Sequence, residues 1–146
     1  MNWKSLENRG RVDRHVTNKS ELDELRAVIA RNLQDAAIDK LSNDNRFSIA
    51  YQAALLSAKM AIACAGYRVK GHGAHQATFQ ALKLAMGPSV KTIADYFDRC
   101  RRKRNELAYD VEGVVSSNDA RRLLRSAERF HRSVEVWIAK HHPNLT

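Results

Sequence analysis

The residues best suited to chemistry lie in one basic run, Arg99-Cys100-Arg101-Arg102-Lys103-Arg104-Asn105. Five of the first six residues of this run are cationic. Arginine can donate paired hydrogen bonds to phosphate oxygens, so the run predicts contact with a phosphorylated ligand. On a helix its side chains diverge, and Arg101 and Arg104 fall near one line. A run of this kind is just as typical of a solvated helix end, where cations suit the C-terminal dipole.

A second basic series follows at near-helical spacing and comprises Arg121 or Arg122, Arg125, Arg129 and Arg132. It lies roughly opposite an apolar stripe, so Arg125 and Arg129 are predicted to bind phosphate together with Arg101, Arg102 and Lys103. A soluble surface would look the same. The chain has 25 Lys and Arg against 16 Asp and Glu, for a net charge of +9. This excess favours a polyanionic partner, most simply RNA or another nucleic acid.

The histidine pair His72 and His75, at the junction of a loop and a helix, is the other candidate for chemistry and is also predicted to bind the RNA phosphate. Residues three apart could share a metal, but no third ligand stands out by spacing, so we predict no metal site and no cofactor. Cys64 and Cys100 are expected to be core thiols. The sequence has no Gly-rich phosphate loop, no G-x-S-x-G motif and no carboxylate cluster suited to two metals.

Helices must position these residues. Apolar periodicity and capping signals predict helices over about 20–41, 45–65 and 74–86, a fourth capped by Ser89 and a last one from Ser117 to just before Pro143. Ser20 is expected to cap the first of them, and no strand is expected. The prediction is an all-α, antiparallel bundle of four to five helices in a single domain over 1–146. Its core would cover about 20–142, with 1–19 as an N-terminal extension or a short helix.

The sequence also bears on location. The first ten residues are polar, unlike a signal peptide, and the most apolar run, 49–65, is interrupted by Gln52, Ser57 and Lys59. We therefore expect a cytoplasmic protein with no membrane span.

The order of the motifs resembles that of the HEPN superfamily of small helical bundles in toxin–antitoxin and defence systems. Arg46-Phe47-Ser48-Ile49-Ala50-Tyr51 leads into an Ala-rich helix, then come Gly66-Tyr67-Arg68 and Gly71-His72-Gly73-Ala74-His75, and finally Arg101 to Tyr109. The resemblance covers about 20–138. It implies a homodimer whose two motif copies face a shared cleft, metal-independent RNA cleavage, and in many members a nucleotidyltransferase partner that acts as antitoxin.

The family motif is an arginine, a polar residue and then a histidine. Arg104 and Asn105 match the first two, but Tyr109 stands where the histidine belongs. The resemblance implies that Arg104 stabilises the charged transition state and that Asn105 orients Arg104 or bonds the phosphate. Tyr109 would hydrogen-bond the phosphate or act as an acid. A tyrosine is a poor base near neutral pH. His72 or His75 could supply the base if their loop folds over the motif.

Three functions remain open from the sequence: a ribonuclease toxin, a degenerate dimer that binds RNA, a nucleotide or a partner without cutting, and a purely interacting operon partner. A structural alternative pairs Arg104 with Asp44, Asp110 or Glu112, so that the motif only stabilises the bundle.

Overall fold

The computed structural model describes residues 1–71, 73–107 and 115–146. Within these ranges the chain is mainly helical, which confirms the all-α prediction. The α-helices are α1 (Trp3–Asn8), α2 (Lys19–Ala36), α3 (Asn43–Cys64), α4 (Ala74–Met86), α5 (Lys91–Leu107) and α6 (Ser117–His141). Short 3-10 helices lie at Pro88–Val90 and Pro143–Leu145. His72 and Tyr109, both assigned to the site from the sequence, lie outside the described residues.

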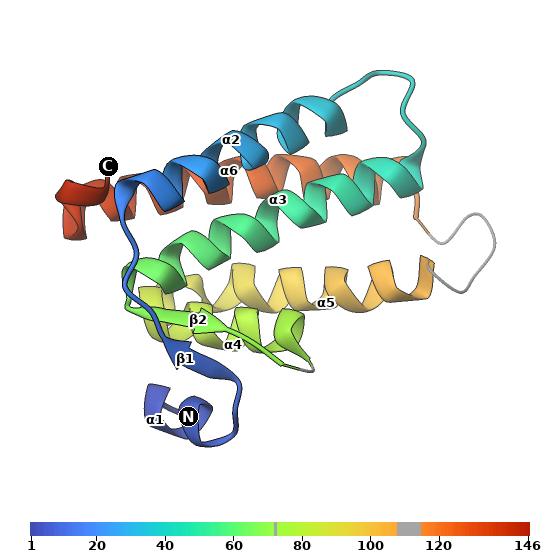
Figure 1. Cartoon of the computed structure of the whole chain (residues 1–146). Coiled ribbons are helices and arrows are strands. Elements are labelled where there is room, and N and C mark those ends of the chain that lie inside the picture. Colours follow the sequence, from blue (N-terminus) through green and yellow to red (C-terminus); the bar gives the residue numbers. More distant parts are fainter. Residues whose placement is uncertain (72, 108–114) are drawn as a thin grey trace.

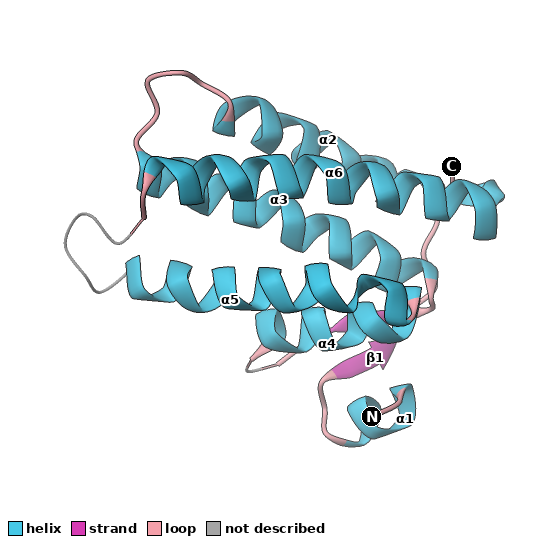
Figure 2. Cartoon of the chain, turned by 180° about the vertical axis from the view of Figure 1, so that it is seen from behind, coloured by secondary structure: helices cyan, strands magenta, loops and turns pink. Residues whose placement is uncertain are grey.

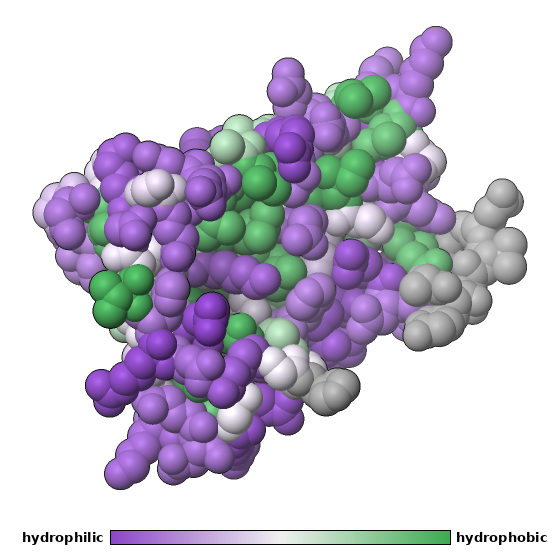
Figure 3. Space-filling model, viewed as in Figure 1, coloured by the Kyte–Doolittle hydropathy of each residue, from purple (hydrophilic) through white to green (hydrophobic). Residues whose placement is uncertain are grey.

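Helix α3 is the centre of the molecule. In Figure 1, α2 and α6 lie on one side of it and α4 and α5 on the other, and α2 and α5 run opposite to α3, α4 and α6. Fourteen residues of α3 are buried, because its many alanines let the neighbouring helices approach closely. The surrounding helices present polar residues outward. Figure 3 shows mostly hydrophilic residues on this face, with hydrophobic patches between the helices.

Helix α3 is long and apolar enough to cross a bilayer by length and composition, contrary to the expectation from its interrupted apolar run. However, 72% of the apolar window is buried inside the protein. Burial in the core explains this composition, as in the central helix of many soluble bundles.

The helix starts differ in detail from those expected. The side chain of Asn18, not Ser20, caps α2 by accepting a hydrogen bond of 2.8 Å from the backbone N–H of Glu21. The helix then ends at Ala36, five residues before the predicted end. Ser89 caps nothing, because it lies inside a 3-10 turn that follows Gly87, whose φ of +88° is a left-handed conformation.

The prediction of no strand was wrong. Strand β1 (Val12–Arg14) pairs antiparallel with β2 (Tyr67–Val69), and Val12 is opposite Val69. This two-stranded sheet joins the N-terminal segment to the end of α3. Trp3 of α1 stacks on Tyr67 at 4.1 Å between ring centroids, and Leu6 and Val12 are buried beside them. Residues 1–19 therefore pack as a small second cluster on α3 and α4.

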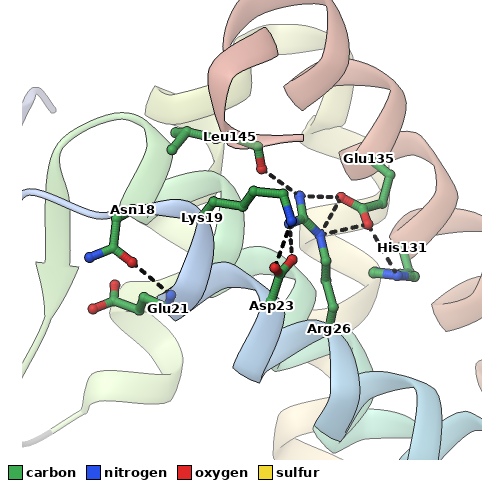
Figure 4. Close-up of polar contacts among 8 residues, drawn as sticks. All are labelled: Asn18, Lys19, Glu21, Asp23, Arg26, His131, Glu135 and Leu145. Carbon is green, nitrogen blue, oxygen red and sulfur yellow. Dashed lines mark hydrogen bonds and ion pairs between the residues drawn. The ribbon is translucent and has the colours of Figure 1, made fainter.

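A clasp of charged residues joins α2 to α6. The Arg26 guanidinium donates to both carboxylate oxygens of Glu135, to the Leu145 carbonyl at 2.9 Å and to Asp23 at 2.7 Å (Figure 4). His131 lies at the edge of the same group, 4.0 Å from Glu135. Because both helices also pack on α3, the clasp closes one side of the bundle.

Candidate functional site

Arg104 lies in the last turns of α5, where the helix has passed beyond its apolar core positions Ala94, Phe97 and Cys100. Its guanidinium carbon is 5.2 Å from the centre of the Tyr51 ring of α3. This is a cation–π distance, so the ring attracts the charge and limits its motion. In the described part of the chain no carboxylate, Asp44 included, lies within ion-pair distance of Arg104. Asp110 and Glu112, its other predicted partners, lie outside that part.

Tyr51 joins Arg104 to a histidine. The ring is fully buried in the middle of α3, and its hydroxyl is 3.4 Å from Nδ1 of His75, at the long limit of a hydrogen bond. Burial raises the pKa of Tyr51 above its usual range, although the positive charge of Arg104 opposes the shift. The phenol therefore stays protonated near neutral pH.

His75 is a neutral base at this position. It lies in the first turn of α4 and is partly exposed. Burial lowers its pKa below the usual value, and the positive charges of Arg104, Lys59 and Arg101 lower it further. When Nδ1 carries the proton, it donates to the Tyr51 oxygen and leaves Nε2 as a proton acceptor. His75 therefore lies close enough to Arg104 for the positive charge of Arg104 to affect its pKa.

Three other cations of the basic run, Arg101, Arg102 and Lys103, have carboxylate partners. Arg101 Nε donates to Asp98 at 2.8 Å, and Arg102 lies 3.9 Å from the same side chain. Lys103 Nζ donates to Asp119 of α6 at 3.0 Å. Arg99 and Arg104 are therefore the two cations of this run without a described carboxylate partner, and of the two it is Arg104 that lies on the Tyr51 ring beside His75.

The remaining described residues that the sequence assigned to the site have no described contact with Arg104, Tyr51 or His75. Asn105 is exposed on the next position of α5, and Arg125 and Arg129 are exposed on α6. The described residues contain no group of three His, Cys, Asp or Glu side chains that could hold a metal. Cys64 and Cys100 are poor nucleophiles, since burial raises the pKa of each thiol to about 11.

Tyr51 was missed by the sequence analysis as a site residue, because an aromatic residue inside an apolar helix indicates core packing. The signal lies in its hydroxyl, which needs a polar partner when the ring is buried. Arg46, from the same motif, is instead structural. It is 2% exposed and donates to the backbone carbonyls of Ala36, Ile38 and Asp39 after α2.

A protein-family model, the HEPN_SAV_6107-like HEPN family, matches residues 37–135. The match covers about two thirds of the chain and includes Tyr51, His75 and the whole basic run of α5. The chain belongs to this HEPN family. The family assignment from the order of the motifs is therefore confirmed. No curated protein and no solved structure matches the chain significantly.

The matched region of this HEPN protein corresponds to the central helices of the bundle. It begins in the loop after α2, contains all of α3, α4 and α5, and ends within α6. Tyr51, His75 and Arg104 come from α3, α4 and α5, so the matched helices together build the candidate site. The N-terminal helix and strand, α1 and β1, lie before the matched residues.

Proposed function

We propose that this HEPN protein binds RNA through a phosphodiester at Arg104 and cleaves the RNA without a metal ion. The observation that carries the proposal is the pairing of Arg104, free of described carboxylates and placed on the Tyr51 ring, with the neutral base His75. A fixed cation beside a base suits a reaction in which negative charge grows on a phosphate.

The chemistry needs one proton acceptor, one cation and one proton donor. Nε2 of His75 takes the proton from a ribose 2′-hydroxyl, whose oxygen then forms a bond to the adjacent phosphorus. The bond from phosphorus to the 5′ oxygen of the next nucleotide breaks, and a 2′,3′-cyclic phosphate remains. The leaving 5′ oxygen takes a proton from water or from the hydroxyl of Tyr109. Arg104 stabilises the additional charge on the phosphorus oxygens.

The proposal also covers the setting of the protein. The chain works as a cytoplasmic homodimer in a toxin–antitoxin or defence system, with a nucleotidyltransferase as its partner. These statements follow from the family resemblance and the basic charge of the chain.

A cleavage assay with EDTA present tests the activity. Wild type should cut unstructured RNA and leave cyclic phosphate ends. Arg104→Gln should lose on the order of 100-fold or more in rate, the usual cost of removing one donor to a developing charge. His75→Gln should lose a similar factor, while Arg31→Gln, which removes an exposed charge from α2, should cut like wild type. Equal cleavage by Arg104→Gln and Arg31→Gln would contradict the proposal.

A second function is RNA binding without cleavage, and one observation favours it: Tyr109 replaces the motif histidine. It is the better account if no RNA is cut although RNA binds, with an affinity that falls steeply as salt is added. If the protein does cleave RNA, the Tyr109→Phe variant shows whether Tyr109 donates the proton to the leaving oxygen. Activity should fall without the hydroxyl only if Tyr109 is that donor.

A further inference from the structure

An open hollow of about 140 Å³ lies between α5 and α6, away from the Arg104 site. Seen from behind, the two helices lie in front of α3 (Figure 2). All three helices line the hollow, with Phe47, Tyr96, Arg99, Cys100, Lys103, Asp119 and Arg122. Phe47 and Cys100 are buried and form an apolar floor, and Arg99 and Arg122 are exposed at the rim. We name this feature the α5–α6 seam.

Two arginines share one aromatic ring in the seam. The guanidinium carbon of Arg122 is 4.8 Å from the centre of the Tyr96 ring, and that of Arg99 is 5.8 Å from it. Both distances are in the cation–π range, so the ring holds two charges that solvent would otherwise leave mobile. Because a planar guanidinium is already preorganised, it loses little further freedom when it binds an anion.

The charge in the seam is unbalanced. Among the described residues that line it, the one acidic side chain is that of Asp119, which lies 3.0 Å from the Lys103 ammonium and also accepts from the backbone N–H of Ser116. No carboxylate of the described residues lies within ion-pair distance of Arg99 or Arg122. Two like charges near one ring repel each other, and an anion placed with them removes this cost.

The seam and the Arg104 site lie on different sides of the same helix segment. Arg99 and Arg104 are about 7.5 Å apart along the helix axis at 1.5 Å per residue, and a helix with its side chains is about 10–12 Å wide. A strand stacked as in a duplex advances about 3.4 Å per nucleotide, so it needs about four nucleotides to pass over α5 from Arg104 to the seam. The exposed Arg102 lies between the two sides.

We propose that the α5–α6 seam binds backbone phosphates of the RNA segment that flanks the phosphodiester held at Arg104, with Arg99 and Arg122 as the phosphate ligands and Tyr96 as their positioning residue. This rests on the proposed function, because it assigns the flanking part of the same substrate. The contacts are to the backbone, so they set affinity and path and do not read sequence.

The test measures binding to oligouridylates of 3 and 10 nucleotides whose ribose carries 2′-O-methyl groups, which prevent cleavage. The double variant Arg99→Gln/Arg122→Gln should weaken binding of the 10-mer about tenfold. Its salt slope should fall by about 1.4, since each neutralised phosphate on a single strand contributes about 0.7. Binding of the 3-mer should stay within about twofold, because a 3-mer fills only the Arg104 site.

A matched control removes two charges elsewhere. Arg31 and Lys40 are exposed and have no described ion-pair partner, so Arg31→Gln/Lys40→Gln has the same net charge as the seam variant. It should leave the 10-mer affinity within about twofold. Tyr96→Phe keeps the ring and should bind like wild type, whereas Tyr96→Leu keeps both arginines and should bind the 10-mer several-fold more weakly.

The possible results separate this inference from the proposed function. Equal losses in the seam and control variants, equal losses on the 3-mer and 10-mer, or no measurable binding of the 10-mer would each overturn the seam. Failure of wild type to cut unmodified RNA would overturn the cleavage alone, because the seam is measured on RNA that cannot be cut.

Discussion

The guanidinium of Arg104 lies over the ring of Tyr51, 5.2 Å from its centre, and the hydroxyl of the same tyrosine reaches His75. One buried side chain therefore contacts the cation of the candidate site through its ring and the base through its hydroxyl. The ring is apolar and the hydroxyl is polar, so these two functions of Tyr51 can be separated by substitution.

Tyr51→Phe keeps the ring and removes only the hydroxyl. It should leave RNA affinity unchanged, because the cation–π contact to Arg104 remains. Tyr51→Leu removes the ring, so Arg104 becomes mobile, and RNA affinity should fall several-fold. Binding titrations with a non-cleavable RNA measure both effects, and circular dichroism shows whether each variant is folded. Equal affinities for the folded Phe and Leu variants would contradict the role of the ring.

The pKa of His75 should be below the ordinary value of about 6.5, because burial and three nearby cations disfavour its charged form. Removing one of these cations should raise it. We therefore expect Arg104→Gln and Lys59→Gln each to move the NMR titration of the His75 ring to higher pH. Arg31→Gln, on the exposed side of α2, should not move it. A His75 pKa above 6.5 in wild type would contradict the environment described.

This lowered pKa also affects stability. Between the lowered pKa of the folded state and about 6.5, the unfolded chain binds more protons at residue 75 than the folded chain does. The free energy of unfolding therefore rises with pH in this window. His75→Gln removes this proton and should make the stability less dependent on pH in that window. Urea unfolding of both proteins at pH 5 and pH 7.5 provides the comparison. His131, whose pKa burial also lowers, remains in both.

The sequence predicted the helices well where a local signal existed. Apolar periodicity and the Gly87-Pro88 stop placed α4 at its observed bounds, and Ser117 begins α6 as expected. Contacts between distant segments could not be predicted. Strand β1 needs a partner 55 residues later in the chain, and three residues carry too little pattern to reveal either strand.

The same limit applies to the site. The basic run and Arg104 stood out because residue type and spacing alone define them. The contact of Arg104 with Tyr51 depends on how α5 packs against α3, which no local pattern encodes. For the same reason the sequence left open whether His75 approaches the motif, since only the placement of α4 decides this.

Arg46 should be a stability residue and not a ligand for RNA. It is almost fully buried, and its guanidinium satisfies three backbone carbonyls where the chain leaves α2. Arg46→Met fills the space but leaves these carbonyls without a donor, which should cost about 2–4 kcal/mol of unfolding free energy. Arg31→Met on the exposed surface should change it by less than about 0.5 kcal/mol. Urea denaturation measures both, and similar losses for the two variants would contradict a stabilising role for the hydrogen bonds of Arg46.

The clasp between α2 and α6 should also stabilise the protein, because its central arginine is mostly buried. The Arg26 side chain is 17% exposed and makes charge-assisted hydrogen bonds to Glu135 from two of its nitrogen atoms, at 2.9 and 3.0 Å. Arg26→Met should lower the unfolding free energy by about 1–3 kcal/mol, since Glu135 and the Leu145 carbonyl lose their donor.

Lys19 is the matched control, because it bonds the neighbouring Asp23 from an exposed position, with 58% of its side chain accessible. Lys19→Met should change the stability little, as is usual for an exposed ion pair. The difference between the two variants should shrink only modestly in 0.5 M NaCl, because salt screens buried charges less than exposed ones. If Arg26→Met unfolds at the same urea concentration as Lys19→Met, α2 is held to the bundle by its apolar face alone.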